Sequence, residues 1–258
     1  MFKIYNEDCI DTMNKIIESN NKVDLIVTSP PYNMTKRKGG NADTGRYDVY
    51  EDWKTEEEYL EWTSEIFCNF DKILKDNKLV IYNFGYSIEN PSLPYKLVNK
   101  IESDTNFTLV DTIIWKKKSG LPFPANKYRL SRNWEYIWVF CKKDYIDNFD
   151  IFKPISSVSK KTNQTYYKVF YNFVEAKNND GKTSFNQATF SSELIEYLLS
   201  IYGDKNYLVY DPFNGTGTTG VACIKNNMNY IGSEISEKQC DFSKERLNKA
   251  LEEMECTA

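Results

Sequence analysis

The sequence predicts an α/β fold, a doubly wound and mostly parallel sheet within one domain that spans residues 1–258. Short apolar runs rich in β-branched and aromatic residues alternate with stretches of helical periodicity along most of the chain. A length of 258 residues is also enough to bury a substantial core around one large sheet.

A strand is expected over residues 23–27, where a continuous apolar run leads into two prolines, Pro30 and Pro31. A helix is expected over residues 55–75, because Thr55 can cap its start, acidic residues fill the first turn and apolar residues follow at helical spacing. The same patterns predict the remaining elements, namely strands over 78–84, 108–115, 135–140, 207–211 and 230–234 and helices over 191–201, 218–226 and 236–255. Strands that alternate with helices favour parallel pairing, with helices on both faces of the sheet.

Two stretches interrupt this alternation, residues 35–51 and residues 153–182. Both are polar, weakly periodic and rich in Lys, Asn, Ser and Tyr. We therefore expect loops or inserted recognition elements there.

The composition excludes several classes of protein. With 41% hydrophobic and 15% aromatic residues, the chain is neither disordered nor collagen-like. It contains no histidine, which excludes Ser-His-Asp and Cys-His nucleophiles and the zinc sites built on HExxH. Its six cysteines include no CxxC pair, so neither a redox dithiol nor a metal site is expected.

The sequence also bears on where the protein is expected to work. No apolar run approaches the roughly 18 residues that a membrane span needs. The first residues lack the basic flank and apolar stretch of a secretory signal. We expect a cytoplasmic protein that does not bind membranes.

Charge is distributed unevenly along the chain. The net charge is −4, yet residues 115–182 carry 14 Lys and Arg against 6 Asp and Glu. Such asymmetry is expected when one face meets phosphates, and it is equally consistent with a solvated, lysine-rich surface.

A glycine-rich turn follows the strand expected over residues 207–211. Gly215, Gly217 and Gly220 satisfy GxGxxG between a strand and a helix. Glu234 follows Asp211 by 23 residues, where an acidic side chain would accept hydrogen bonds from ribose hydroxyls. The carboxylate of Asp211 would repel a pyrophosphate but would suit a cationic ligand such as S-adenosylmethionine. A tight glycine turn without a ligand is the remaining interpretation.

The segment from Ser29 to Tyr32 follows the first predicted strand. The Ser29 hydroxyl and the Pro30 carbonyl are hydrogen-bond acceptors held close together, because the prolines restrict the backbone. Two such acceptors could hold both N–H bonds of an exocyclic amine on a nucleobase and localise its lone pair, while Tyr32 stacks on a base that has left the helix. A proline-rich turn in which Ser29 only caps the chain is the alternative.

Two of these motifs together resemble a known family. Residues 28–33, Thr-Ser-Pro-Pro-Tyr-Asn, resemble the catalytic motif of S-adenosylmethionine-dependent amino-methyltransferases that act on DNA. Residues 211–220 resemble the cofactor loop of the family, and the order of the two motifs resembles its β class. The resemblance implies a seven-stranded, Rossmann-like methyltransferase sheet with inserted target-recognition loops, among them residues 153–182.

Other segments are also similar to family patterns, namely residues 6–9, 134–142 and 231–236. Residues 185–190 resemble the segment that helps to hold the methionine end of the cofactor. Family members often carry His-Pro there, whereas this chain has Asn186 and Gln187.

The resemblance assigns roles to individual residues. It implies that the catalytic residues are Ser29, Pro30, Pro31 and Tyr32. It implies that S-adenosylmethionine is bound by Asp8, Cys9, Asp211, Pro212, Phe213, Gly215, Thr216, Gly217 and Glu234. The basic residues expected to contact DNA are Lys36, Arg37, Lys116, Lys117, Arg129, Arg132, Lys160 and Lys161.

The predicted function is methyl transfer to an exocyclic amino group in double-stranded DNA, without a metal. In this family a serine at the position of Ser29 favours N4 of cytosine, whereas N6 of adenine is the alternative. C5-cytosine chemistry is excluded, because it needs a cysteine after a proline and none of the six cysteines follows one.

Two other classes of function stay open. One is an RNA or protein-glutamine methyltransferase, and the other is a DNA-binding relative without catalytic activity. The sequence leaves open a cognate restriction endonuclease as partner, and either a monomer or a homodimer.

Overall fold

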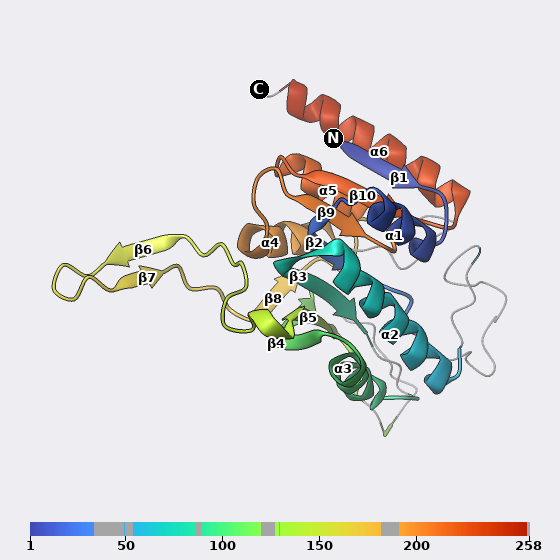
Figure 1. The fold of residues 1–258 in the computed structure, drawn as a ribbon, viewed down its shortest axis with the longest axis horizontal. Helices are drawn as coiled ribbons and strands as arrows, with labels where there is room; N and C mark the ends of the chain where they lie inside the picture. The colour runs from blue at the N-terminus through green and yellow to red at the C-terminus, as the bar shows by residue number, and fades with distance from the viewer. Residues whose placement is uncertain are drawn as a thin grey trace.

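The computed structural model describes residues 1–33, 49, 54–85, 89–119, 127, 128, 130–181 and 191–256. It confirms the predicted α/β class, because one large sheet carries helices on both faces (Figure 1). Within these described residues the sheet has eight strands, so the expected number of seven was wrong by one.

The strands of this sheet follow the order β1, β10, β9, β2, β3, β5, β4, β8. Their bounds are Phe2–Tyr5 (β1), Val23–Thr28 (β2), Leu74–Phe84 (β3), Phe107–Lys117 (β4), Trp134–Lys142 (β5), Phe173–Ala176 (β8), Leu208–Asp211 (β9) and Asn229–Ser233 (β10). Among the described strands, only β5 runs antiparallel to its neighbours, β3 and β4, and the other pairs of this sheet are parallel. The prediction of a mostly parallel sheet is therefore confirmed.

In the described part of the chain, three helices cover each face of the sheet. On one face lie α1 (Cys9–Glu18), α2 (Glu56–Ile73) and α3 (Leu93–Asp104), and on the other lie α4 (Ser192–Tyr202), α5 (Thr218–Lys225) and α6 (Glu237–Glu255). Strand β3 shows how the two cores are divided, because Leu79 and Ile81 join the α4 side while Val80 and Tyr82 join the α2 side.

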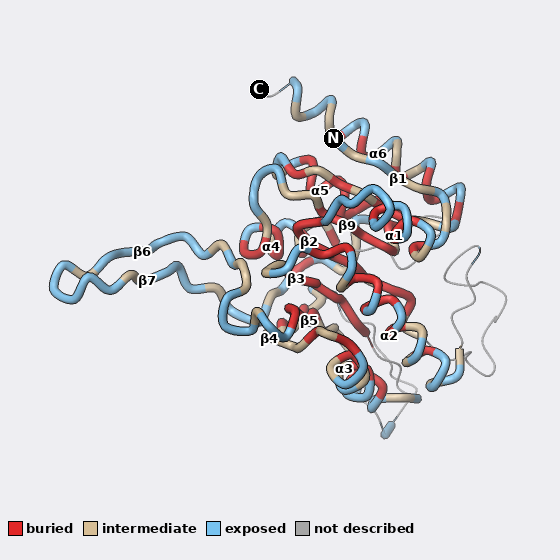
Figure 2. The backbone as a smooth tube through the Cα atoms, in the orientation of Figure 1, coloured by how far each residue is buried: buried red, intermediate tan, exposed pale blue. Residues whose placement is uncertain are grey.

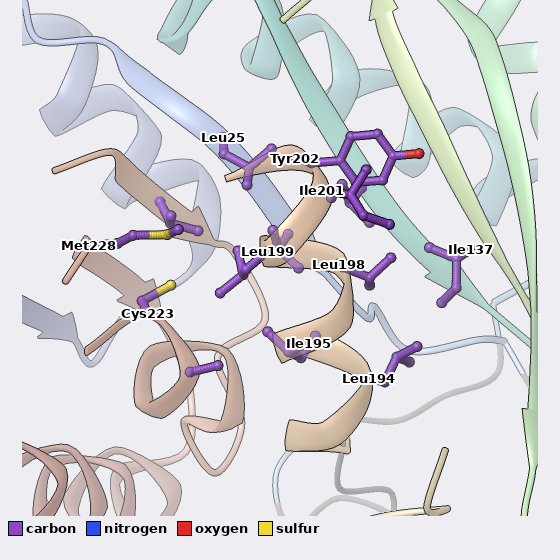
Figure 3. Packing of buried hydrophobic residues seen from close by; sticks show 14 of the residues in the cluster. Leu25, Ile137, Leu194, Ile195, Leu198, Leu199, Ile201, Tyr202, Cys223 and Met228 are labelled. Carbon is purple, nitrogen blue, oxygen red and sulfur yellow. The ribbon is translucent and has the colours of Figure 1, made fainter. Parts of the chain in front are cut away.

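Helix α4 packs its apolar face against the centre of the sheet (Figure 3). Leu194, Leu198 and Leu199 are buried in one cluster with Leu25 of β2 and Ile137 of β5. Burying a leucine side chain stabilises a fold by about 1.5–3 kcal/mol, so these contacts fix the helix firmly on the sheet.

Most predicted elements are present, with shifted ends. Thr55 caps α2 through a capping box with Glu58, as its position predicted. The helix expected over residues 55–75 ends at Ile73, because the chain enters β3 directly at Leu74. Strand β1 and helices α1 and α3 were not predicted.

The expectation for residues 153–182 was partly wrong. Strand β8 lies within this range and pairs with β4 as the last strand of the large sheet. Only its last residue, Ala176, is buried, so its sequence shows little apolar periodicity. Strands β6 (Ile155–Val158) and β7 (Thr165–Tyr167) form a separate antiparallel hairpin that projects from the body and is largely exposed (Figures 1 and 2).

The other stretch expected to be a loop, residues 35–51, lies outside the described residues except for Val49. Among the described helices, none combines the length and the apolar character that crossing a membrane requires.

Candidate active site

A cavity lies at the carboxyl ends of the parallel strands, where β9 and β2 are neighbours. The chain leaves β9 towards α5 on one face of the sheet and leaves β2 towards α2 on the other face. Such a switch point leaves a crevice between the two connections, and α/β folds bind their ligands there. The cavity has about 950 Å³ of empty volume including its open mouth, a size suited to a nucleoside-sized ligand.

The structure brings most of the expected cofactor residues together at this cavity. Those that line it are Asp8, Cys9, Asp211, Pro212, Phe213, Gly215, Thr216 and Glu234. Of the expected catalytic residues, Ser29 and Pro31 also line it. Gly217 shapes the turn beneath, whereas Pro30 and Tyr32 are not among the described lining residues.

Asp211 ends β9 at the floor of the cavity and is only 3% exposed. Its carboxylate accepts hydrogen bonds from the Thr28 hydroxyl at 2.8 Å, the Thr219 hydroxyl at 2.8 Å and the Phe213 amide at 3.1 Å. Burial raises the pKa of Asp211 to about 6, although these three hydrogen bonds act to lower it. Asp211 therefore ties β2 to β9 and also offers the cavity a carboxylate.

The glycine-rich turn needs its glycines for two reasons. Gly215 and Gly217 have φ values of 51° and 78°, in the left-handed region that other residues adopt at a cost. A Cβ atom on Gly217 would also lie 2.3 Å from the hydroxyl oxygen of Ser243 in α6. The turn therefore packs directly on α6, where Arg246 donates a hydrogen bond to the Thr216 carbonyl at 2.7 Å.

Glu234 follows β10 and faces the same turn. Its carboxylate accepts hydrogen bonds from the backbone amides of Gly215 at 2.8 Å and Ser236 at 3.0 Å. A carboxylate offers about four acceptor positions, and a ligand hydroxyl is a donor of the kind that it accepts. The position that the sequence assigned to Glu234, at the end of the next strand, is the one observed.

The lining of the cavity also includes an exposed carboxylate and an apolar surface. Asp8 is exposed, lines the cavity and caps α1 by accepting a hydrogen bond from the Ile10 amide at 2.8 Å. Trp62 and Phe213 lie with ring centroids 5.5 Å apart, and both line the cavity. Such a surface suits a flat, weakly polar ring system.

The Ser-Pro-Pro-Tyr segment is held from two sides. The hydroxyl of Tyr59 in α2 donates a hydrogen bond of 2.6 Å to the Pro31 carbonyl, and both prolines are buried. Tyr32 packs on Phe84 with ring centroids 5.3 Å apart, and its hydroxyl lies 2.8 Å from the Ser29 hydroxyl. This support fixes the Ser29 hydroxyl at the edge of the cavity.

The basic residues expected to contact DNA fall into three groups. Lys116 and Lys117 form ion pairs with Glu175 and Glu135, and Arg132 is half-buried. The exposed turn of the β6–β7 hairpin carries Lys160 and Lys161. The residues outside the described part of the chain are Lys36, Arg37 and Arg129, as is the segment 185–190.

Several residues at the site were not identified from the sequence. Trp62 belonged to the apolar pattern of a predicted helix, and Arg246 to a charged helix surface. Neither position carries a local signal that separates it from its neighbours. Asn214, in contrast, lies inside the glycine-rich turn, and that position is a sequence signal. Its amide donates to the Ser243 hydroxyl and accepts from the Tyr230 hydroxyl, and these contacts depend on the tertiary structure.

Comparison with known proteins gives consistent matches over nearly the whole chain. The model of the DNA methylase family matches residues 23–245. The chain is 27% identical to the type II methyltransferase M.BglII of Bacillus subtilis over 263 residues, which cover 93% of this chain and 67% of that protein.

Solved structures share the fold. The M1.HpyAVI–SAM complex has a TM-score of 0.63 and 24% identity, and the match covers 96% of this chain and 100% of that chain. A PvuII DNA methyltransferase described as cytosine-N4-specific has a TM-score of 0.66 and 17% identity, over 97% of this chain and 93% of that chain.

Proposed function

The chain belongs to the DNA methylase family, and from this premise we propose that it methylates the exocyclic amino group of a base in double-stranded DNA, preferably N4 of cytosine. One observation carries the proposal. Ser29, at the end of β2, lines the same cavity as Asp211, Gly215 and Glu234 at the ends of β9 and β10. The cavity thus joins a hydrogen-bond acceptor for an amine to a set of groups suited to a cofactor.

S-adenosylmethionine is the cofactor that we propose for this cavity. Asp8, Asp211 and Glu234 place three carboxylates around it, and they suit the cationic and hydroxyl groups of this molecule. Trp62 and Phe213 supply an apolar surface for its adenine. When bound, the cofactor supplies the methyl group, and a solved relative of similar fold is described as a complex with SAM.

The residues of the chain act by positioning the target amine. A base within a duplex cannot reach the cavity, so it must leave the stack, at a cost of a few kcal/mol. The Ser29 hydroxyl and the Pro30 carbonyl then accept hydrogen bonds from its amino group, and Tyr32 stacks on the base. Holding the nitrogen lone pair towards the methyl donor is the main contribution to the rate.

The proposed DNA surface combines the β6–β7 hairpin with the basic residues around it. Residues 153–182 are the proposed target-recognition insert, and the exposed side chains there include Tyr166, Tyr167 and Lys161. Positive charge contributes affinity through the phosphates, whereas the aromatic side chains could contact bases or sugars. The other proposed phosphate contacts are Lys36, Arg37, Lys116, Lys117, Arg129, Arg132 and Lys160.

The proposal also covers a functional partner, the cellular compartment and the oligomeric state. The relative M.BglII is described as a type II methyltransferase, which supports a cognate restriction endonuclease as a functional partner of this chain as well. The protein would modify cytoplasmic DNA as a monomer or a homodimer. Light scattering after gel filtration, with and without DNA, distinguishes the two.

Product analysis tests the proposed function. The purified protein is incubated with S-adenosylmethionine and mixed-sequence duplex DNA, which is then digested to nucleosides for mass spectrometry. N4-methylcytosine is the expected product, whereas N6-methyladenine would keep the mechanism and change the base.

Parallel reactions test the other classes of function. RNA and glutamine-containing peptides replace DNA, and DNA binding is measured separately. Methyl transfer to RNA or peptide alone would contradict the DNA assignment. DNA binding without any methyl transfer would indicate a relative that has lost its catalytic activity.

A further inference from the structure

A hydrogen-bonded network of polar side chains lies directly behind Ser29. Asn83, near the end of β3, is 1% exposed, and Glu135 of the neighbouring strand β5 has a side chain 14% exposed. Tyr32 connects them, because its hydroxyl lies 2.8 Å from Asn83 Oδ1 and 3.1 Å from Glu135 Oε2. Burying polar groups costs free energy unless they are hydrogen-bonded, so a buried network of this kind is a candidate for a functional role.

The orientation of the Asn83 amide follows from its neighbours. Its Nδ2 donates to the Tyr136 carbonyl at 2.9 Å and to Glu135 Oε2 at 3.3 Å, and both of these oxygens can only accept. The amide oxygen must then face the other way, towards the hydroxyls of Ser29 and Tyr32. Asn83 therefore presents an acceptor, and not a donor, to the catalytic segment.

This acceptor determines where the two hydroxyl protons point. Tyr32 can donate to Asn83 or to Glu135, and Ser29 can donate to Asn83 Oδ1 at 3.3 Å or to the Tyr32 oxygen at 2.8 Å. If Tyr32 donates to Ser29 instead, the Ser29 proton still has the Asn83 oxygen as its acceptor. Each arrangement directs the Ser29 proton into the network and leaves at least one lone pair of the Ser29 oxygen for the cavity.

We propose that Asn83 and Glu135 are positioning residues that make the Ser29 hydroxyl a hydrogen-bond acceptor towards the target amine. A hydroxyl can donate as well as accept, unlike a carboxylate. A proton donated to the amine would occupy the lone pair that must attack the methyl group. By taking up the hydroxyl protons, the network prevents this competition, so the inference rests on the proposed function and adds a requirement to it.

Two further features determine the position of Glu135, one an ion pair and the other the space left by a glycine. Lys117 forms an ion pair with its other carboxylate oxygen, Oε1. Gly85 leaves the necessary space, because a Cβ atom there would lie 2.9 Å from the Tyr32 ring and 3.3 Å from Glu135 Oε1. The network thus has a charged anchor on one side and the cavity on the other.

The test compares variants that keep or remove the acceptor oxygen. Asn83→Leu removes it, and we expect kcat for methyl incorporation into mixed-sequence duplex DNA to fall by about 100-fold. Asn83→Asp keeps an oxygen facing Ser29, and its second oxygen must carry a proton to donate to the Tyr136 carbonyl as the amide does. We expect this variant to lose less than about 10-fold. KM for DNA and the Kd for S-adenosylmethionine should change by no more than about twofold in both variants.

Glu135→Gln provides a second, less buried variant, with an expected loss in kcat of about 10-fold. Glu56→Gln is its matched control, because Glu56 likewise pairs with one lysine, Lys96, and one asparagine, Asn90. The control should keep the kcat of the wild type. Thermal unfolding of every variant identifies any loss of folded protein.

The outcomes separate the two hypotheses. Equal kcat values for the wild type, Asn83→Leu and Glu135→Gln would overturn the inference while leaving the proposed function intact. The inference would also be overturned if Asn83→Leu and Asn83→Asp lost kcat equally and in proportion to the decrease in their unfolding temperatures. A wild-type protein that transfers no methyl group to DNA would overturn the proposed function and this inference with it.

Discussion

The carboxylate of Asp211 shows how burying a charged group destabilises a fold. Its pKa rises from 3.8 to about 6 because burial penalises the charged form. The folded protein therefore holds this proton more tightly than the unfolded chain does. Its stabilising effect is fully present below about pH 4 and is lost as the pH rises through about 6, a difference of about 3 kcal/mol.

Asp211→Asn removes the charge and keeps the shape. Its amide oxygen can still accept from Thr28 and the Phe213 amide, while the Thr219 hydroxyl can rotate to accept from the new NH2 group. We expect the variant to be more stable than the wild type by about 2 kcal/mol at pH 8, with the difference shrinking towards pH 4. Its affinity for S-adenosylmethionine should fall. Urea unfolding at several pH values checks the first expectation, and a pH-independent difference would contradict it.

Ser29→Ala isolates the contribution of one hydroxyl. If Ser29 holds the target amine, its loss should lower kcat by about 100-fold, the size typical of one preorganised hydrogen-bonding group. The Kd for S-adenosylmethionine should stay within about twofold, because Asp211, Gly215 and Glu234 are untouched. Calorimetric titration and methyl incorporation measure the two quantities, and undiminished kcat would show that Ser29 does not have this role.

At the scale of elements, the turn between β9 and α5 has its shape because it packs on α6. Gly217 combines a φ of 78° with a close approach to Ser243, so an alanine there meets both backbone strain and a steric clash. Gly217→Ala should lower the free energy of unfolding by about 2–3 kcal/mol. It should also weaken S-adenosylmethionine binding by about 10-fold or more, because the turn lines the cavity.

Gly181→Ala is the matched control for this variant. Gly181 also has a positive φ, 120°, but a Cβ atom there would meet no atom within 4 Å. We expect a loss of about 1 kcal/mol and unchanged cofactor affinity, since only backbone strain applies. If both variants bind the cofactor like the wild type, the turn does not hold the cofactor.

For the whole molecule, we expect the distribution of charge over the surface to govern DNA affinity more than the net charge does. The chain carries a net charge of −4, yet the projecting β6–β7 hairpin has Lys160 and Lys161 exposed at its turn. Exchanging both for alanine should reduce the slope of log affinity against log salt for duplex DNA by about 2. Fluorescence anisotropy from low to moderate salt measures this slope.

A double variant of α6, Lys244→Ala with Lys249→Ala, removes the same charge from a helix that lies away from the hairpin (Figure 1). Its slope should equal that of the wild type. If the two double variants reduce the slope equally, net charge and not the hairpin governs the affinity for DNA. Methyl transfer to DNA by both variants shows that the cavity is intact.

The sequence by itself determined the α/β class, the capped start of α2, the glycine-rich turn and the Ser-Pro-Pro-Tyr segment. Each depends on residues a few positions apart, such as Thr55 and Glu58, so local physical chemistry is enough to predict it. The resemblance to DNA amino-methyltransferases depended on the same short motifs. The family match bears it out.

Only the tertiary structure decided what surrounds those motifs. Strand β8 was not predicted, because an exposed edge strand carries little apolar periodicity. Helix α3 was not predicted either, although its buried face packs on the sheet. The network behind Ser29 joins Asn83 to Glu135 across 52 residues and Tyr32 to Glu135 across 103. Such contacts depend on which strands become neighbours, and strand pairing is settled by the packing of the whole sheet.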